Sequence, residues 1–349
     1  ESLPALAGNN PPPLFVDVAD LHLQLARMLM GYSGYGEAWR LQFLSDLAQL
    51  PDYDEGYRHY GGDSGRGAPV DEDGNPVFHK VPKSWSQAAS DGERWRWTLN
   101  RAMELNPGRA NQVLMDLAGF FGQQFDVQTM AYYGALFGRS DDDDTKKDES
   151  GPFAVQTLGE NETIARLATG IKRFKLPDEF NFIKLYLQVA DSPKSGYGEQ
   201  ALNQLSQIFE NRRQYDRAVE IWNRNIKEYG VGHDKWKQKR IDQILGNWGE
   251  FENIGTFPAG KEASVEFRFR NGRKAGFTAH EINVPQILAD IKGYLTSNPR
   301  QLDWNRMNIA NIGWMLIQKD QAKYVGQEVA RWDLDLQPRD KHFDRRITV

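Results

Sequence analysis

The sequence contains no cysteine in its 349 residues. This absence excludes disulfide bonds, zinc–thiolate centres and a cysteine nucleophile within the chain, and a chain without thiols is compatible with an oxidising compartment. No run of 18 apolar residues occurs either, so no transmembrane segment is predicted. No signal peptide is visible, and we expect the Pro-rich residues 1–15 to form an extended lead-in.

The chain also lacks an excess of basic charge. Its 43 Lys and Arg residues are outnumbered by 48 Asp and Glu residues, which gives a formal net charge of −5. Nucleic-acid-binding proteins usually carry a basic patch, so no nucleic-acid partner is expected. With 40% hydrophobic and 26% charged residues, the composition is that of a globular protein, and the length allows two or three domains.

Motifs for common kinds of catalysis are missing as well. The sequence has no Gly-x-Ser-x-Gly elbow of a serine hydrolase. His280 and Glu281 resemble the start of a zinc-hydrolase motif, but Val284 stands where the second His is needed. We therefore predict that the protein is not an enzyme and that it uses no metal and no cofactor.

Helical periodicity dominates the first 250 residues. The helices predicted from apolar spacing span residues 16–30, 37–50, 90–106, 108–123, 127–137, 160–174 and 178–190. The apolar stripe expected in the first of them is made by Val18, Leu21, Leu25, Met28 and Leu29. At the start of the third, Ser90 and Glu93 fit a capping box.

The clearest helical pair follows residue 198. Leu202, Leu205 and Phe209 form one apolar stripe, and Tyr215, Ala218 and Trp222 form the next. The small Ala218 allows two antiparallel helices to approach closely. The pair resembles a tetratricopeptide repeat, although the usual glycine and closing proline of that repeat are missing. The predicted fold is therefore mostly α, with a tetratricopeptide-like α-solenoid of helical hairpins over residues 16–250.

The pentapeptide Ser-Gly-Tyr-Gly-Glu occurs twice, at residues 33–37 and 195–199. A phosphate-binding glycine loop follows a buried strand, whereas both copies follow a helix, and their glutamates would repel a phosphate. Glutamate in the first turn of a helix suits the helix dipole instead. We interpret both copies as turns that lead into a helix of a repeated hairpin.

Two long loops are predicted, at about residues 52–82 and 138–158. The first is rich in Gly, Asp and Tyr and is expected to contain a small hairpin turned at Asp73-Gly74. The candidate partner-binding residues are Tyr53, Tyr57 and Tyr60, because exposed Tyr offers contact area at low entropy cost. The alternative is that these side chains pack the loop onto the helices.

Both loops contain acidic runs, at Asp71–Asn75 and Asp141–Asp144. Carboxylate oxygens are calcium ligands, but neither run has the twelve-residue spacing of an EF-hand. A tight turn and a solvated loop are the favoured interpretations, and calcium binding is left open.

From Phe257 the apolar period changes from 3.6 to two, which is typical of strands. Around the Asn271-Gly272 turn we predict a hairpin that pairs Val265 with Phe277 and Phe267 with Ala275. A helical insertion is expected at about 285–320, and residues 326–338 and 341–349 alternate again. Residues 251–349 thus predict a smaller β-sandwich-like domain with a helical insertion, incomplete at its C-terminal end.

Several segments carry a family resemblance. The C-terminal third resembles the part of large bacterial α2-macroglobulin-like proteins that leads into their macroglobulin β-sandwich domains, through "FPAGKEASVEFRFRNGRKAGFTAHEINV", "YLTSNPRQLDWNRMNIANIGWMLI" and "VARWDLDLQPRDKHFDRRITV". The helical part resembles the helical N-terminal portion of the same proteins, through "SDGERWRW", "VQTMAYYG" and "IARLATGIKRFKLPDEFNFIKLYLQ". The resemblance covers most of residues 31–349.

The resemblance implies that the chain is an N-terminal piece of a longer protein of the periplasm or another part of the cell envelope, or a secreted one. The best-known relatives trap proteases with a bait segment and a thioester formed from Cys and Gln. Without cysteine this chain has no thioester, and no bait is identified, so the resemblance assigns no catalytic residue here.

These observations favour a non-enzymatic protein-binding scaffold. The resemblance adds a protease as a partner of the full-length protein. The alternative is an architectural subunit of an envelope or surface complex. A hydrolase with an acid-lined cleft is the third hypothesis, and it would need a pair of carboxylates that the sequence does not single out. The oligomeric state is left open.

Overall fold

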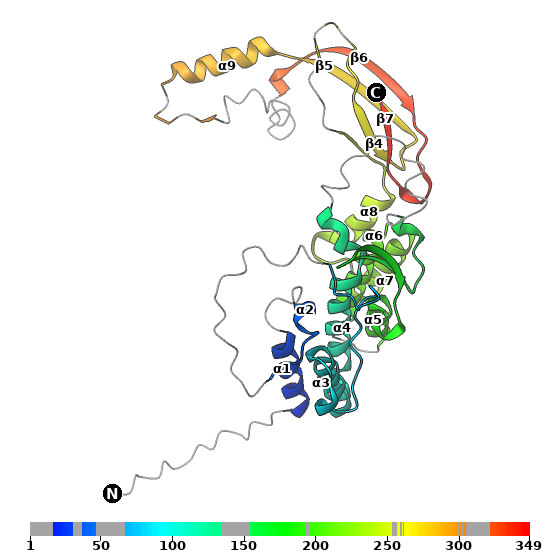
Figure 1. Ribbon diagram of the computed structural model, residues 1–349. Coiled ribbons are helices and arrows are strands. Elements are labelled where there is room, and N and C mark those ends of the chain that lie inside the picture. The colour runs from blue at the N-terminus through cyan, green and yellow to red at the C-terminus, as the bar shows by residue number, and fades with distance from the viewer. Residues whose placement is uncertain are drawn as a thin grey trace, which may run out of the picture. The chain divides into compact units, whose positions relative to one another are not determined.

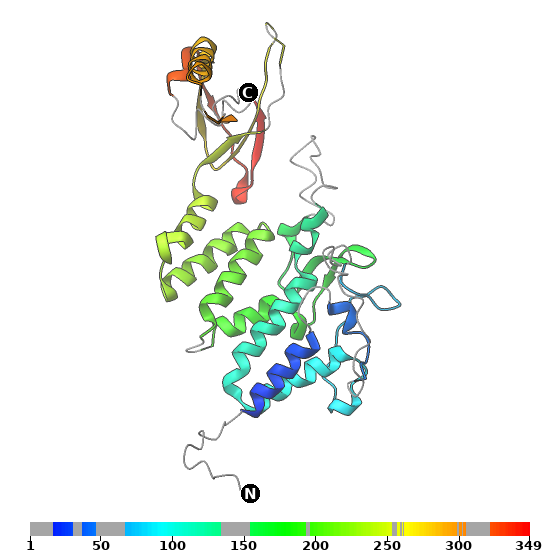
Figure 2. The ribbon, with the colours of Figure 1, turned by 90° about the vertical axis from the view of Figure 1, so that its left-hand side faces the viewer.

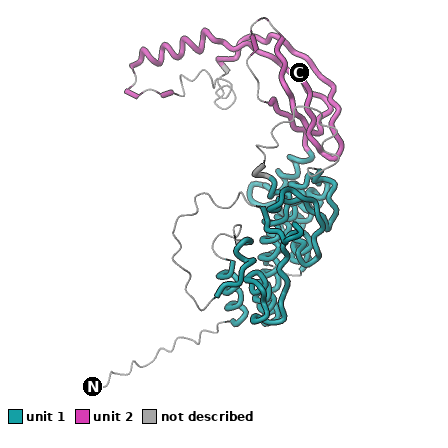
Figure 3. Tube along the Cα trace, viewed as in Figure 1, with its two compact units in different colours: residues 1–245 teal, residues 246–349 magenta. Residues whose placement is uncertain are grey.

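The computed structural model describes residues 17–30, 37–46, 67–133, 154–192, 196–252, 257–258, 260, 262–298, 300–301, 303–304 and 322–349. The chain divides into two units, Glu1–Leu245 and Gly246–Val349 (Figure 3). The first unit is mainly helical and the second contains small antiparallel sheets, as expected in outline from the sequence. In the described part, no helix is both long and apolar enough to cross a membrane.

Helices make up most of the first unit (Figure 1). The α-helices are α1 (Val18–Met30), α2 (Glu37–Arg40), α3 (Asp91–Leu105), α4 (Ala110–Phe125), α5 (Phe182–Ala190), α6 (Gly198–Asn211), α7 (Tyr215–Tyr229) and α8 (Trp236–Leu245). Short 3-10 helices are η1 (Trp85–Gln87), η2 (Pro107–Arg109), η3 (Val127–Tyr133), η4 (Val155–Thr157), η5 (Asp178–Phe180) and η6 (His233–Lys235). The predicted helix at 127–137 is thus the 3-10 helix η3 as far as it is described.

The capping residues of α3 fix its start where the sequence predicts it. Ser90 Oγ accepts a hydrogen bond from the Glu93 N–H at 3.2 Å. The Glu93 carboxylate accepts from the N–H of Ala89 at 2.8 Å, one residue before the position that a capping box uses. Trp95, Leu99 and Ala102 follow on the buried face. The capping residues and the helical spacing of the apolar residues therefore both predict α3 correctly.

The helix predicted at 160–174 is wrong. These residues form the hairpin of β1 (Glu162–Leu167) and β2 (Gly170–Lys175), with Glu162 opposite Lys175. The chain reverses at Gly170, whose φ of +118° only glycine adopts without strain. The Thr163 hydroxyl donates to the carbonyl of Phe125 at 2.5 Å and so joins the hairpin to the end of α4.

Residues 67–82, the described part of the first long loop, are partly ordered by this hairpin. Ala68 forms an isolated parallel bridge with Leu167, and Val70 forms an antiparallel bridge with Pro76. The turn between the latter two includes Gly74 at a φ of +76°. The small hairpin predicted at Asp73-Gly74 is therefore confirmed.

Two predictions near the start of the chain need correction. In the predicted stripe of α1, Leu29 is buried and Leu25 packs against the core, but Val18, Leu21 and Met28 are exposed. The buried face is completed by Ala19, Leu23 and Ala26. The small alanines of that face suit close packing against α3. The helix predicted at 37–50 ends at Arg40, since the carbonyls of Leu41 and Phe43 accept from the first N–H groups of α3. Residues 47–50 lie outside the described residues.

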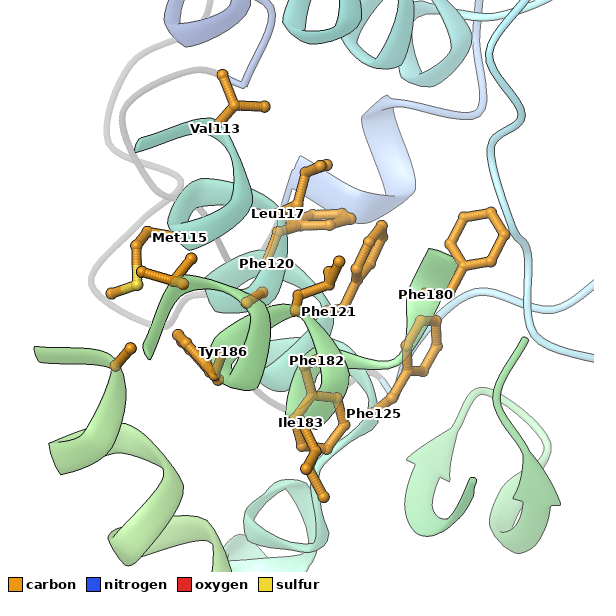
Figure 4. Packing of buried hydrophobic residues seen from close by; sticks show 14 of the residues in the cluster. Val113, Met115, Leu117, Phe120, Phe121, Phe125, Phe180, Phe182, Ile183 and Tyr186 are labelled. Atoms are coloured by element: carbon orange, nitrogen blue, oxygen red, sulfur yellow. The ribbon is translucent and has the colours of Figure 1, made fainter. Parts of the chain in front are cut away.

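Aromatic side chains fill the core between α4 and α5 (Figure 4). Phe121 of α4 lies edge-on to Phe180, with ring centroids 5.2 Å apart. Trp95 of α3 meets Phe120 in the same manner at 4.9 Å. These edge-to-face pairs are favourable beyond the apolar area that they bury.

The helices from α5 to α8 pack in sequence order, each against the next (Figure 2). The predicted stripes of α6 and α7 face the core: Tyr215 is half-buried against it, and the other five residues are nearly inaccessible, namely Leu202, Leu205, Phe209, Ala218 and Trp222. Gly198, the first residue of α6, lies so close to α7 that a Cβ there would be 2.1 Å from the Tyr229 hydroxyl oxygen. A larger residue at Gly198 would therefore have to displace the exposed end of the Tyr229 side chain.

The second unit contains a sheet of order β3-β4-β7 and a two-stranded ribbon of β5 and β6, all antiparallel. Its elements are β3 (Trp248–Phe251), β4 (Glu266–Arg270), β5 (Lys274–Ile282), α9 (Val284–Thr296), η8 (Ala322–Tyr324), β6 (Val325–Asp335), η9 (Asp340–His342) and β7 (Arg345–Thr348). α9 occupies the start of the helical insertion predicted at 285–320, and residues 305–321 are outside the described part.

The predicted hairpin of β4 with β5 is wrong. Phe267 of β4 stands opposite Phe251 and Ile347, and Phe277 of β5 stands opposite Trp332. The rings of Phe267 and Phe277 meet edge to face, at 85° with centroids 5.1 Å apart. The turn at Asn271 therefore carries the chain from one sheet to another, and the apolar alternation reflects packing between sheets.

Candidate functional site

A groove of about 320 Å³ lies between α1, α3 and α4 of the first unit. Leu23, Met30, Trp95, Met115 and Phe120 supply most of its apolar lining. The groove is open to solvent, and its accessible lining is about as polar as it is apolar.

Helical geometry brings the lining residues to one place. On α1, residues 23, 26, 27 and 30 follow the spacing i, i+3, i+4, i+7 of a single helix face. On α4, residues 115, 116, 119, 120 and 123 likewise share one side. Gly119 is among them, and a Cβ there would meet nothing closer than the Tyr186 hydroxyl, at an ordinary 3.9 Å.

Three polar side chains reach the groove: Arg27, Asp116 and Gln123. Asp116 is accessible to solvent, but surrounding protein atoms raise the pKa of its carboxyl by partial burial, and the charge of Arg27 opposes this rise. Apart from that longer-range attraction, neither charged side chain has a hydrogen bond or an ion pair with another described residue. The groove therefore presents one carboxylate and one guanidinium, whose charges attract each other.

A smaller hollow, of about 10 Å³, is lined by His79 and aromatic residues of α4. That volume holds one water molecule at most. His79 Nδ1 lies 3.4 Å from Ser90 Oγ, and burial lowers the pKa of this histidine to about 4. Ser90 is already engaged as the cap of α3, so the pair is structural and leaves no room for a substrate.

The residues singled out in the sequence lie elsewhere. Tyr53, Tyr57 and Tyr60 are outside the described residues, as is the acidic run Asp141–Asp144. Asp71–Asn75 forms a tight turn in which Asp71 Oδ1 accepts from the Asn75 N–H at 2.8 Å. Within the described ranges, no three His, Asp or Glu side chains are grouped to hold a metal ion.

The two pentapeptides differ in what is described of them. Residues 33–36 of the first copy lie outside the described part. In the second copy, α6 begins at Gly198, and the Glu199 carboxylate accepts a hydrogen bond from Lys237 of α8 at 2.6 Å. The interpretation as a turn that leads into a helix is confirmed for this copy.

Sequence reasoning missed the groove. Its clearest signal is Asp116, a lone charge in the otherwise apolar stretch from Val113 to Phe121 of α4. Arg27 lies 89 positions earlier, and no local pattern connects the two residues.

Comparison of the chain with protein-family models, with curated proteins and with solved structures found no match in any of the three.

Proposed function

We propose that this chain is a non-enzymatic protein-binding scaffold that belongs to an α2-macroglobulin-like protein of the cell envelope. The groove between α1, α3 and α4 is the observation that carries the proposal. Its lining combines apolar side chains such as Met30 with the exposed charges of Arg27 and Asp116, a mixture that suits the surface of a partner protein. The serial packing of α5 to α8 supports an α-solenoid, an architecture that commonly binds proteins.

The groove also favours binding over hydrolysis. Glycoside hydrolysis, the main alternative with an acid-lined cleft, uses two carboxylates about 5–10 Å apart. Among the described residues that line the groove, Asp116 is the one carboxylate.

Cross-linking from the groove tests the scaffold function. A photoreactive benzoylphenylalanine is placed at Arg27, on the groove, and in a matched protein at Glu220, an exposed residue of α7. We expect a cell-envelope protein to be cross-linked from position 27 and not from position 220. The captured protein is then purified and titrated against the chain by calorimetry.

The titration uses two matched variants. Asp116→Trp fills the groove and is expected to weaken binding by at least about tenfold, which corresponds to roughly 1.4 kcal/mol. Glu220→Trp is expected to leave the affinity unchanged. Equal affinity of both variants, or equal cross-linking from both positions, would contradict the proposal.

The full-length protein is proposed to bind a protease. Incubation with proteases of different specificity is expected to give a complex of increased mass and a loss of activity toward protein substrates. Unchanged mass and activity with every protease would rule out the inhibitor role and leave the scaffold function standing.

A further inference from the structure

We propose that an apolar stripe of α9 is the docking site of residues 307–317, an apolar segment of the same chain that lies outside the described residues. The α9 stripe consists of Val284, Leu288, Ile291 and Leu295. This inference concerns the second unit and goes beyond the proposed function, which rests on the first.

The α9 stripe is one side of an amphipathic helix that stays open to solvent. Its four residues follow the spacing i, i+4, i+7, i+11 of a single helix face. Val284, Leu288 and Leu295 are about half exposed, whereas Ile287, on a neighbouring side, is buried. An apolar helix face of this kind normally packs against another element, and where it is exposed it marks an interaction site.

The chain on either side of the proposed segment is held against α9. In the last turn of the helix, the Tyr294 hydroxyl accepts a hydrogen bond from the N–H of Asp303 at 2.7 Å. One turn earlier, Asp290 forms an ion pair with Lys323. These two positions on α9 are about 6 Å apart along the helix axis. The part of the chain that includes residues 305–321 therefore starts and ends beside α9.

The sequence of residues 307–317, MNIANIGWMLI, makes this segment the favoured occupant. It contains no charged residue, and eight of its eleven residues are apolar, so its removal from water is favourable. Because both of its flanks are tied to α9, its effective concentration at the stripe is high. A second copy of the chain or a partner protein would have to compete with this tethered segment.

The position of the anchors agrees with this occupant. At about 100° per residue, Tyr294 lies about a quarter of a turn around the helix from the middle of the α9 stripe. A chain that leaves the helix beside Tyr294 therefore needs only a short step to reach Leu295 and Ile291. No charged residue stands within the stripe to oppose an uncharged segment.

Photo-cross-linking within the whole chain tests the inference. Benzoylphenylalanine replaces Leu288, on the α9 stripe, or in a matched protein Ala289, an exposed residue on another side of the helix. Both positions fall in one tryptic peptide, residues 275–292, and trypsin releases the segment within residues 307–319. Isotope-labelled chains are mixed with unlabelled ones, so that cross-links within one chain and between two copies differ in mass.

We expect position 288 to be cross-linked to residues 307–319 of the same chain, and position 289 not to give this product. Products that contain both isotopes would assign the α9 stripe to a second copy and overturn the inference. Equal products from positions 288 and 289, or no product with residues 307–319, would overturn it as well.

Hydrogen exchange gives a second readout that does not need the cross-linker. Leu288→Asp places a charge in the α9 stripe and is expected to speed the exchange of residues 307–317 by at least about tenfold. Ala289→Asp, the same charge on another side of the helix, is expected to leave that exchange unchanged. Circular dichroism confirms that both variants are folded. Equal exchange in the two variants would contradict the docking, and none of these results bears on the groove of the first unit.

Discussion

The ammonium group of Lys237 lies 2.6 Å from Oε1 of Glu199 and 2.7 Å from Oδ1 of Asn225. The Lys237 side chain is fully buried. Asn225 in turn donates to Asn203 Oδ1 at 2.8 Å. One polar network thus joins the first turn of α6 to α7 and to α8. The glutamate of the second Ser-Gly-Tyr-Gly-Glu is therefore a structural partner of a buried cation.

We expect Glu199→Gln to lower the free energy of unfolding by about 1–2 kcal/mol, because a buried ammonium loses its charged partner. The value is at the low end for buried pairs, since the Glu199 side chain is 47% exposed and water replaces part of the interaction. Urea unfolding followed by circular dichroism measures the change. Glu220→Gln is the control, and an equal effect of the two variants would contradict the structural role of Glu199.

Asp126, fully buried after the last residue of α4, is expected to make folding less favourable as pH rises. Burial raises the pKa of its carboxyl to about 6, against the attraction of Arg212 and a hydrogen bond from the Val127 N–H. In the unfolded chain the pKa is 3.8. Between about pH 4 and pH 6 the folded state therefore holds more protons, and stability falls through this window.

The variant Asp126→Asn removes this titration. Its unfolding free energy relative to the wild type is expected to increase by on the order of 2 kcal/mol between about pH 4 and pH 6. Urea unfolding at several pH values gives the difference curve, and a constant offset between the two proteins would contradict the raised pKa.

His79 is expected to act in the opposite direction. Burial lowers the pKa of its imidazole from 6.5 to about 4, with Glu93 opposing the change. As pH falls through this window, the unfolded state gains a proton that the folded state does not, so stability is lost. Between about pH 6.5 and pH 4 the wild type is expected to lose on the order of 2–3 kcal/mol of unfolding free energy through this histidine, and His79→Gln is expected to abolish that loss. An unaltered pH slope in the variant would be evidence that His79 is not buried as described.

Gly170 offers a test of the β1–β2 hairpin. A Cβ at this position would meet no atom within 4 Å, so Gly170→Ala changes only the backbone energy at a φ of +118°. We expect a loss of about 1–3 kcal/mol in unfolding free energy. Gly119→Ala, inside α4, is expected to raise stability by about 0.5–1 kcal/mol. Similar effects of both substitutions in urea unfolding would contradict the hairpin.

The absence of native cysteine allows a direct test of strand pairing. Thr278 stands opposite Arg331 in the β5–β6 ribbon. Thr278→Cys with Arg331→Cys is expected to form a disulfide on mild oxidation, seen as a loss of free thiol and a shift in non-reducing electrophoresis. Thr278→Cys with Ser264→Cys, neighbours in the hairpin that the sequence suggests, is expected to stay reduced. Faster oxidation of the second pair would reverse the assignment.

Local signals account for what the sequence predicted correctly. The cap at Ser90 and the stripes of α6 and α7 depend on residues within a few turns of one another, and all are found as expected. The error at 160–174 arises because its apolar residues occur at 164, 167, 171 and 174, which is helical spacing. In the folded chain, β-branched residues and a left-handed Gly170 favour the hairpin.

Partners that are distant in sequence account for what was missed. β4 pairs with β7, almost eighty positions later. The sequence of either strand alone does not indicate this partner or the register of the pairing. The groove likewise depends on α1 and α4 coming together, so neither Arg27 nor Asp116 looks unusual in its own helix. The three tyrosines chosen from composition lie in a segment outside the described residues.

The bridge between Ala68 and Leu167 has a consequence for how the first unit folds. Ala68 donates to the carbonyl of Arg166 at 3.0 Å and accepts from the N–H of Ala168 at 2.8 Å. These bonds close a loop of about one hundred residues, which costs chain entropy before any later contact repays it. Helices α6 to α8 each pack on the helix before them, whereas α5 also packs on α4, which lies far earlier in the sequence. We therefore expect closure of this loop to slow the folding of the first unit.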